Sequence, residues 1–221
     1  ARARLALAFP DTYEIGMSNL GLMILYDLVN QREDLVAERV YAPWVDMEAA
    51  MRAAEIPLFS LETRHALHQF DVVGFSLQHE LNYSNVLNML DLGGIPMLAQ
   101  ERGPDVPLVI AGGSCTYNPE PMAAFIDLFV IGEGEEVLIE LLDCVADWKA
   151  SARPRTTGAR QELLLRLSSI PGIYVPSLYQ CAYNDDGTLS AVEPSMAGVP
   201  TRVRKRIVPR LLPAPTRPIV P

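Results

Sequence analysis

Residues able to do chemistry stand directly behind apolar runs in this chain. Asp11, Tyr13, Glu14 and Gly16 lie in "FPDTYEIGMSNLG" (9–21), between the apolar run "RLALAF" and a stretch with helical spacing. Turns between a strand and a helix are usually shorter and carry fewer ionisable groups. The segment is therefore a candidate ligand-binding loop.

Three further loops share this position behind a predicted strand. They are "SLQHELNYSN", "GGSCTYNPEP" and "GEGEE", and their candidate binding residues are Ser76, Gln78, Gly112, Gly113, Ser114, Gly132, Glu133 and Gly134. In an open parallel sheet, ligands bind outside the carboxyl ends of the strands, where loops and helix N-termini converge. We therefore expect the four loops to border one cleft.

Each candidate also has a purely structural interpretation. The double glycine at 112–113 is as readily explained by a tight turn as by close approach of a ligand. Glutamates in "GEGEE" favour a helix N-terminus through the helix dipole. His65 and His68 lie three residues apart, but no third metal ligand is near them in the sequence, so surface or interface histidines are the favoured interpretation.

The elements that position these loops alternate along the chain. Short β-rich runs occupy 4–9, 35–41, 71–77, 107–113 and 127–133, and helical periodicity covers 18–30, 46–54, 80–92 and 134–150, with Ser18 as the expected N-cap of the first helix. This alternation predicts right-handed βαβ units and a doubly wound α/β fold with a parallel sheet, Rossmann-like or flavodoxin-like.

Composition changes after residue 150. We expect a Rossmann-type domain at 1–150, an extension at 151–200 with a linker, a short helix and a β-hairpin turning at Asp186-Gly187, and a basic, proline-rich connector at 201–221. The chain opens with "ARAR", without an initiator methionine, and ends among prolines, which suggests that it is part of a longer protein.

Charge and cysteine content exclude several classes of protein. The connector holds six basic residues and no acid, which leaves 12 basic against 27 acidic groups in the first 200 residues. An acidic body does not suit nucleic acid, and the connector is interpreted as a solvated or docked segment. The three cysteines are far apart, the apolar runs are too short to span a bilayer and no signal peptide is visible, so we expect a cytoplasmic protein.

The longer motifs resemble a known family. "PLVIAGGSCTYNPEPMAAFIDLFVIGEGEEVLIELL" (107–142) is similar to cobalamin-binding-type domains that precede a radical S-adenosylmethionine core, and "FPDTYEIGMSNLG" with "DVVGFSLQHELNYSN" resembles a subgroup of fused, uncharacterised radical S-adenosylmethionine proteins. The resemblance implies possible cobalamin binding in this chain. It also implies a downstream core with a [4Fe-4S] cluster and S-adenosylmethionine, since the CxxxCxxC motif of that core would follow "PTRPIVP".

One expected cobalt ligand is absent. The family pattern DxHxxG places a histidine under the cobalt, whereas this chain reads DxYxxG from Asp11 to Gly16. Tyrosine must lose a proton of pKa about 10 before it ligates well, so coordination by Tyr13 is not favoured. The SxL motif near Ser76 also has its leucine one residue early, as "SLQ". Many relatives of this kind hold cobalamin without a protein ligand, so the cofactor stays possible.

Three functions remain open from sequence. The first is a module that supplies a cofactor or substrate face to the downstream core, and the second is a structural docking domain that has lost the corrinoid. The third, a flavodoxin-like nucleotide binder, is the weakest because no GxGxxG or P-loop pattern follows any strand. We expect no catalysis from these residues alone, and the substrate and reaction of the complete protein stay open.

Overall fold

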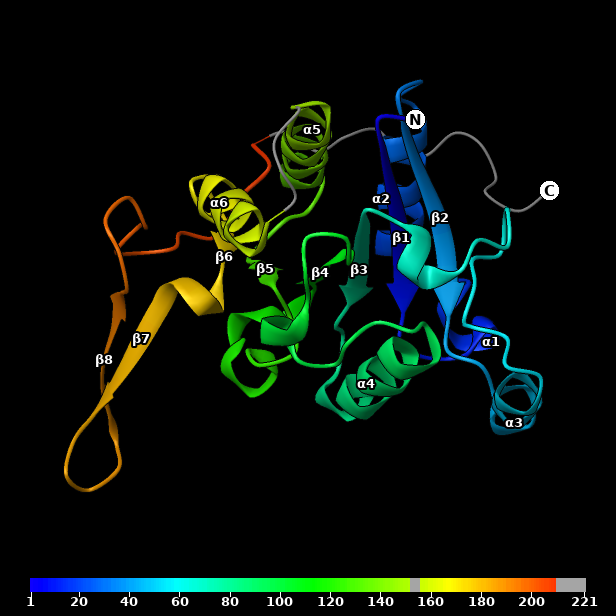
Figure 1. Ribbon diagram of the computed structural model, residues 1–221, viewed down its shortest axis with the longest axis horizontal. Coiled ribbons are helices and arrows are strands. Elements are labelled where there is room, and N and C mark those ends of the chain that lie inside the picture. The colour runs from blue at the N-terminus through cyan, green and yellow to red at the C-terminus, as the bar shows by residue number, and fades with distance from the viewer. Residues whose placement is uncertain (152–155, 210–221) are drawn as a thin grey trace.

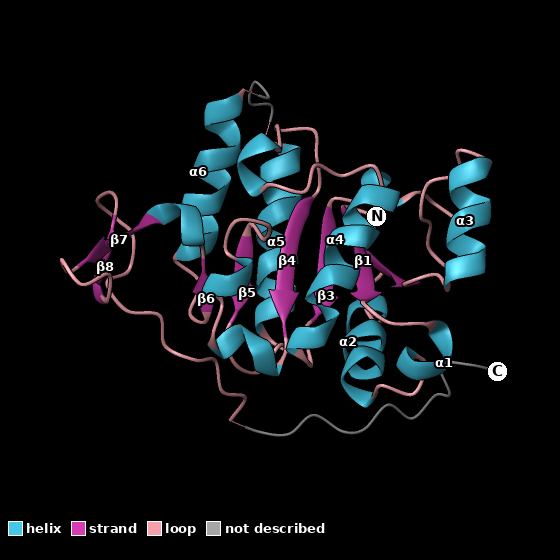
Figure 2. Cartoon of the chain, turned by 90° about the horizontal axis from the view of Figure 1, so that it is seen from below, coloured by secondary structure: helices cyan, strands magenta, loops and turns pink. Residues whose placement is uncertain are grey.

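A six-stranded sheet with helices on both faces forms the body of the computed structural model, which describes residues 1–151 and 156–209. The strands are β1 (Ala3–Phe9), β2 (Leu35–Tyr41), β3 (Val72–Ser76), β4 (Leu108–Gly112), β5 (Leu128–Val130) and β6 (Ile173–Tyr174), in the order β2-β1-β3-β4-β5-β6. The first five run parallel, and the arrowheads of β1 and β4 in Figure 2 point to the edge where α1 lies. This is a doubly wound α/β fold of flavodoxin-like strand order.

The helices divide between the two faces of the sheet. They are α1 (Tyr13–Gly16), α2 (Leu20–Asn30), α3 (Val45–Ala53), α4 (Tyr83–Leu92), α5 (Val137–Ala150) and α6 (Thr157–Ser168). Short 3₁₀ turns lie at Leu67–Gln69, Glu80–Asn82, Ala99–Glu101, Ser114–Tyr117, Glu120–Met122 and Pro176–Leu178. Figure 1 shows α2 and α5 on one side and α3 and α4 on the other, each side with its own buried cluster.

Alternation along β1 separates the two clusters. Leu5 and Leu7 face α2 and α5, whereas Ala6 and Ala8 face the side of α3 and α4, because successive side chains on a strand point to opposite faces. The small alanines admit Phe75 and Met89 on that side, which are completely or almost completely buried. The sheet is therefore covered on both faces, as a near-continuous apolar strand requires.

Several sequence expectations need correction. The sheet is not wholly parallel, because β6, which was not predicted, pairs antiparallel with β5 through Val130 and Ile173. The N-cap of α2 is Asn19 rather than Ser18, since the Asn19 side chain accepts the Leu22 amide at 2.9 Å. Strand β5 spans three residues instead of the seven expected at 127–133.

Residues beyond 150 join the same body before the chain leaves it. Helix α6 places Leu163, Leu164 and Leu167 in the cluster formed with α5. The expected hairpin is present as β7 (Tyr179–Tyr183) and β8 (Leu189–Pro194), with a turn in which Gly187 has φ 81°. Figure 1 shows this hairpin standing away from the six-stranded sheet.

A buried carboxylate ties the late segments to the sheet. Asp127 Oδ2 accepts the Val109 amide at 2.7 Å, Arg102 Nη1 at 3.0 Å and Arg160 Nη2 at 2.9 Å. The Arg102 side chain is fully buried, and this burial lowers the pKa of its guanidinium against the opposing effect of Asp127. One charge therefore holds α6, β4 and the loop before β4 together.

Replacement of Asp127 by asparagine removes the carboxylate that pairs with both of these buried arginines. Loss of one partner from a buried ion pair is expected to reduce the free energy of unfolding by about 3–5 kcal/mol. Urea denaturation followed by circular dichroism measures this change. The matched variant Asp143→Asn breaks a half-exposed pair with Arg32 and should change stability little. Equal midpoints for the two variants would contradict the assigned role of Asp127.

Candidate functional site

A cavity of about 240 Å³ opens at the carboxyl edge of the sheet, between the strands and helices α2 and α5. It lies where β1 and β3 meet, which is the point where the strand order reverses and where ligands bind in doubly wound sheets. Seven of the predicted site residues line it: Ser76, Gln78, Gly112, Gly113, Gly132, Glu133 and Gly134. Three of the four predicted loops thus meet at one cavity.

The walls of this cavity are apolar and its rim is polar. Its aliphatic lining consists of Leu5, Leu7, Leu22, Leu25, Ile110, Val130 and Leu138. Ser76, Gln78, Glu133 and Glu135 supply its polar groups. An apolar cavity of ~150 Å³ holds a single benzene ring, so this one has room for a flat ring system larger than benzene.

The two adjacent glycines have different roles. A Cβ on Gly113 would lie 2.5 Å from the Leu77 carbonyl oxygen, and its φ is 110°, so this position needs glycine for the close contact between loops. A Cβ on Gly112 would meet nothing within 4 Å. Gly112 therefore leaves space at the cavity. Of the two interpretations of the double glycine, the tight backbone contact applies to Gly113 and the space for a ligand applies to Gly112.

Ser114 lies beside the cavity without lining it. Its hydroxyl donates to the Gln78 carbonyl at 3.0 Å, and Gln78 Nε2 donates to Ser76 Oγ at 3.2 Å. These bonds join the loops after β3 and β4. Ser114 thus positions a cavity residue rather than bordering the cavity itself.

The first loop forms a separate corner. Asp11 Oδ1 accepts the Thr12 amide at 2.8 Å, and the ring of Tyr13 packs edge-on against Tyr41 with centroids 5.3 Å apart. A Cβ on Gly16 would lie 2.6 Å from the rings of Phe9 and Tyr41. Neither these residues nor the exposed Glu14 line the cavity, and Gly16 is the residue of this loop that packs closely at the end of β1.

Two asparagines that the sequence analysis did not single out fix this corner to α4. Asn82 Nδ2 and Asn85 Nδ2 donate to the Pro10 carbonyl oxygen at 2.7 and 2.9 Å. The spacing of the two amides in "LNYSN", three residues apart and hence on one helix face, was the available signal.

The basic connector contacts the acidic body at the fourth predicted loop, "GEGEE". Arg206 N donates to the Ile131 carbonyl at 2.8 Å, and Glu133 N donates to the Arg206 carbonyl at 3.1 Å. A Cβ on Gly132 would lie 2.2 Å from that carbonyl oxygen. Gly132 therefore makes room for the protein's own connector, which is a structural reason for glycine at this position.

Charge pairing reinforces this contact. Arg206 forms ion pairs with Glu136 at 2.9 Å and with Glu140, and these hydrogen bonds raise the pKa of its guanidinium. The Val208 amide donates to the carboxylate of Glu133, which also lines the cavity. The connector and the cavity thus share one loop.

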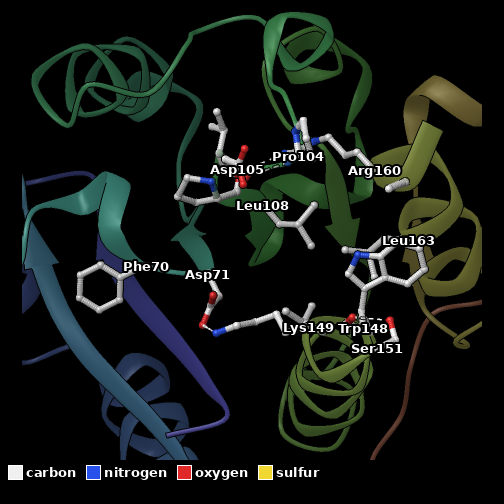
Figure 3. A pocket seen from close by; sticks show the side chains of 14 residues that line it. Phe70, Asp71, Pro104, Asp105, Leu108, Trp148, Lys149, Ser151, Arg160 and Leu163 are labelled. Carbon is white, nitrogen blue, oxygen red and sulfur yellow. Dashed lines mark hydrogen bonds and ion pairs between the residues drawn. The ribbon is translucent and has the colours of Figure 1, made fainter. Parts of the chain in front are cut away.

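A second, smaller cavity lies at the opposite edge. It measures about 100 Å³ and is lined by residues that precede β3 and β4, with Lys149 and Asp71 paired across it at 2.7 Å (Figure 3). Ligands of parallel sheets do not bind at the amino ends of the strands, so this cavity does not extend the candidate site. Within residues 1–151 and 156–209, no cluster of three or more histidine, cysteine or acidic side chains has metal-site geometry.

The variant Arg206→Gln tests how the connector is held. Loss of two ion pairs should accelerate amide hydrogen exchange at 203–208 severalfold while global stability changes little, because partly exposed pairs contribute only about 0.2–1 kcal/mol each. Exchange followed by mass spectrometry measures this, with the exposed Arg204→Gln as the matched control. High salt, roughly 1 M, should give the parent chain the same fast exchange. Unchanged exchange in the variant would show that backbone contacts alone hold the segment.

Comparison with known proteins gives this geometry a family. An uncharacterized protein of Methanocaldococcus jannaschii is 24% identical over 142 residues, which are 62% of this chain and 26% of the relative. The solved structure of the radical S-adenosylmethionine methyltransferase TsrM from Kitasatospora setae, with tryptophan substrate and a SAM analog bound, matches 84% of this chain and 29% of that chain at TM-score 0.45 and 15% identity. This chain thus spans about a quarter of the curated relative.

No helix among the described residues has both the length and the apolarity needed to cross a bilayer.

The family described as the N-terminal region of radical SAM proteins matches residues 21–176, which include β2 to β6 and most of the cavity lining. The chain belongs to this family of radical SAM N-terminal regions.

Proposed function

We propose that this region is a cofactor-facing module that binds a corrinoid and presents it, or the substrate, to the radical SAM core of the same polypeptide. The observation that carries the proposal is the apolar cavity at the β1/β3 switch point, bordered by three glycine-containing or polar loops. A large apolar pocket with a few convergent polar groups is the default binding site of such a fold.

The residues present fit part of a corrinoid. The cavity suits the flat heterocycle of a nucleotide tail, because Gly112 leaves space beside its aliphatic walls. Ser76 and Gln78 would supply hydrogen-bonding groups at its rim. The macrocycle is too large for about 240 Å³ and would remain outside the cavity. When bound, the corrinoid supplies a cobalt centre that can carry an organic group, while the protein supplies binding and orientation.

The proposal includes no protein ligand to cobalt. Tyr13 occupies the position of the family histidine, but its ring packs against Tyr41 and it does not line the cavity. Phenol is also a poor ligand near neutral pH, because its pKa is about 10. Binding would therefore rest on the cavity and on contacts of the loops with the corrinoid periphery.

The radical chemistry belongs to the part of the polypeptide that follows. Three thiolates must hold a [4Fe-4S] cluster that leaves one iron for S-adenosylmethionine. The three cysteines of this chain are scattered over a buried, a half-buried and an exposed position. Both cofactors are accordingly assigned to the downstream core.

A second candidate function is a docking domain without a corrinoid. Two observations favour it. The connector fills the space beside Gly132 and donates a hydrogen bond to the Glu133 carboxylate, and the ring of Tyr13 packs against Tyr41. In that case the predicted cofactor loops serve only to join the module to its core. Binding measurements separate the two candidates.

Titration with hydroxocobalamin, followed by visible absorbance and calorimetry, tests the proposal. We expect saturable binding that Gly112→Val abolishes, because the new side chain enters the cavity. Gly103→Val is the matched control, since a Cβ there also meets nothing within 4 Å but the residue lies away from this cavity. Absence of binding by the parent chain at high cobalamin concentration would favour the docking domain. Release of a flavin or nicotinamide nucleotide on denaturation would favour a nucleotide binder.

The variant Tyr13→Phe tests cobalt ligation separately. It keeps the ring on Tyr41 and removes the hydroxyl, so we expect the visible spectrum and the affinity of the cobalamin complex to stay unchanged. A shift of the cobalt absorption bands in this variant would show that the phenol coordinates the metal.

A further inference from the structure

The β7–β8 hairpin carries an unpartnered apolar face. Residues directly opposite each other in an antiparallel pair of strands lie on the same face. In this hairpin Cys181 lies opposite Val192, and Tyr183 lies opposite Leu189. Tyr183 is 66% exposed and Leu189 53% exposed. The other face carries Gln180 opposite Glu193. A two-stranded hairpin is marginally stable by itself, so exposure of its apolar face is unfavourable.

The base of the hairpin is fixed to the body. Tyr179 packs against Tyr174 with ring centroids 5.0 Å apart, and its hydroxyl donates to the Pro200 carbonyl at 2.7 Å. The Ser195 amide donates to the Leu178 carbonyl at 2.8 Å and closes the two ends of the hairpin. The apolar face therefore has a defined position although it stands away from the sheet (Figure 1).

The same face continues into a groove of about 640 Å³ at the β6 edge of the body. Its hairpin side includes Tyr179 and Cys181, and its floor includes Ile126, Leu164 and Tyr174. The far side is formed by small and apolar residues of two short 3₁₀ segments, among them Leu98, Ala99, Ala123 and Ala124. Groove and hairpin together form one concave, largely apolar surface.

Charged groups in the groove form hydrogen bonds and ion pairs within the protein. The Tyr174 hydroxyl donates to Glu120 at 2.6 Å, and the pairing of Asp127 with Arg102 and Arg160 is internal. These contacts use most of the hydrogen-bonding atoms of the charged groups named here, with Arg160 Nε as the buried atom among them that has no hydrogen-bond partner within the described residues. The surface has the composition of an interface between domains, with an apolar centre and a polar rim.

We propose that this surface docks the domain that follows this region in the same polypeptide. The family is the N-terminal region of radical SAM proteins, and about three quarters of the curated relative lies outside the matched part. The chain leaves the hairpin through residues 199–208, whose last part is held by Arg206 at the loop 131–133, so a following domain is tethered to the same body that carries the groove. Tethering raises its effective concentration, and a modest apolar interface is then sufficient. This inference is independent of corrinoid binding.

The native thiol on the hairpin is a suitable probe. Cys181 is exposed, Cys144 is half-buried on α5, and Cys115 is buried. Labelling with N-ethylmaleimide, quantified for each cysteine by peptide mass spectrometry, is compared between the 221-residue chain and the complete polypeptide. We expect labelling of Cys181 to be slower by about tenfold or more in the complete polypeptide, the ratio for a docked state populated ten to one. Labelling of Cys144 should stay the same.

Two variants of the complete polypeptide make the test specific. Tyr183→Ser with Leu189→Ser alters only exposed side chains of the hairpin and should restore fast labelling of Cys181. Ile56→Ser, which replaces a 48% exposed side chain on another part of the surface, should leave the protection intact. Folding of each variant is checked by the unchanged labelling of Cys144.

Three results would overturn the proposal. Equal labelling of Cys181 in the two forms of the parent protein would show that nothing covers the hairpin. Protection that appears in the 221-residue chain and increases with its concentration would identify a second copy as the occupant. Protection that survives the double substitution would place the contact elsewhere. Hydroxocobalamin binding by the double variant is measured in parallel, and because the cavity lies at another edge, failure of one proposal leaves the other testable.

Discussion

Parallel pairing of β1 with both β2 and β3 is the constraint on which the structure depends. A chain that pairs in this way must send α2 over one face of the sheet and α3 over the other, because crossover connections are right-handed. The chain therefore leaves β1 toward β2 and leaves β3 toward β4, and these two connections separate between the carboxyl ends of β1 and β3. The cavity lies at this separation, so its position follows from topology before any side chain is considered.

Side-chain type and size then determine the lining of the cavity and how much of it stays unfilled. Aliphatic residues of β1, α2 and α5 line it, and Gly112 leaves it partly unfilled. A close-packed interior normally excludes such space, and the apolar cavity at the switch point is the site to which the proposal assigns a ligand. The adjacent Gly113 has the opposite role, since it permits backbone contact between neighbouring loops.

Connector, hairpin and cavity divide the surface of the domain between different tasks. The connector binds the loop at 131–133 through one arginine and a group of glutamates on and before α5. The hairpin and its groove lie at the β6 edge, beyond the buried Asp127 that ties α6 to the sheet. Under the two proposals, one edge of the module would bind a ligand and another would contact a neighbouring domain, in a chain of the family of radical SAM N-terminal regions.

Local patterns in the sequence were sufficient for the five parallel strands, the principal helices and the hairpin, because each depends on periodicity or turn residues within a short window. Strand β6 was missed since two residues carry no periodicity, and it exists only because α6 returns the chain to the free edge of β5. Ser18 and Asn19 are both residue types that cap helices, so the sequence pattern did not distinguish them. In the structure the helix begins at Leu20, and Asn19 is its N-cap.

The loops of the candidate site show the same division. The sequence by itself determined which residues follow strands, and therefore that Ser76, Gly112 and Gly132 would lie at one edge. Only the tertiary structure decided that Asp11 and Tyr13 form a packed corner, and that Arg206 takes the space beside Gly132. The physical reason is range. Periodicity and turn chemistry act between neighbours in the chain, whereas contacts between a loop and a segment some 70 residues away depend on how the whole chain packs.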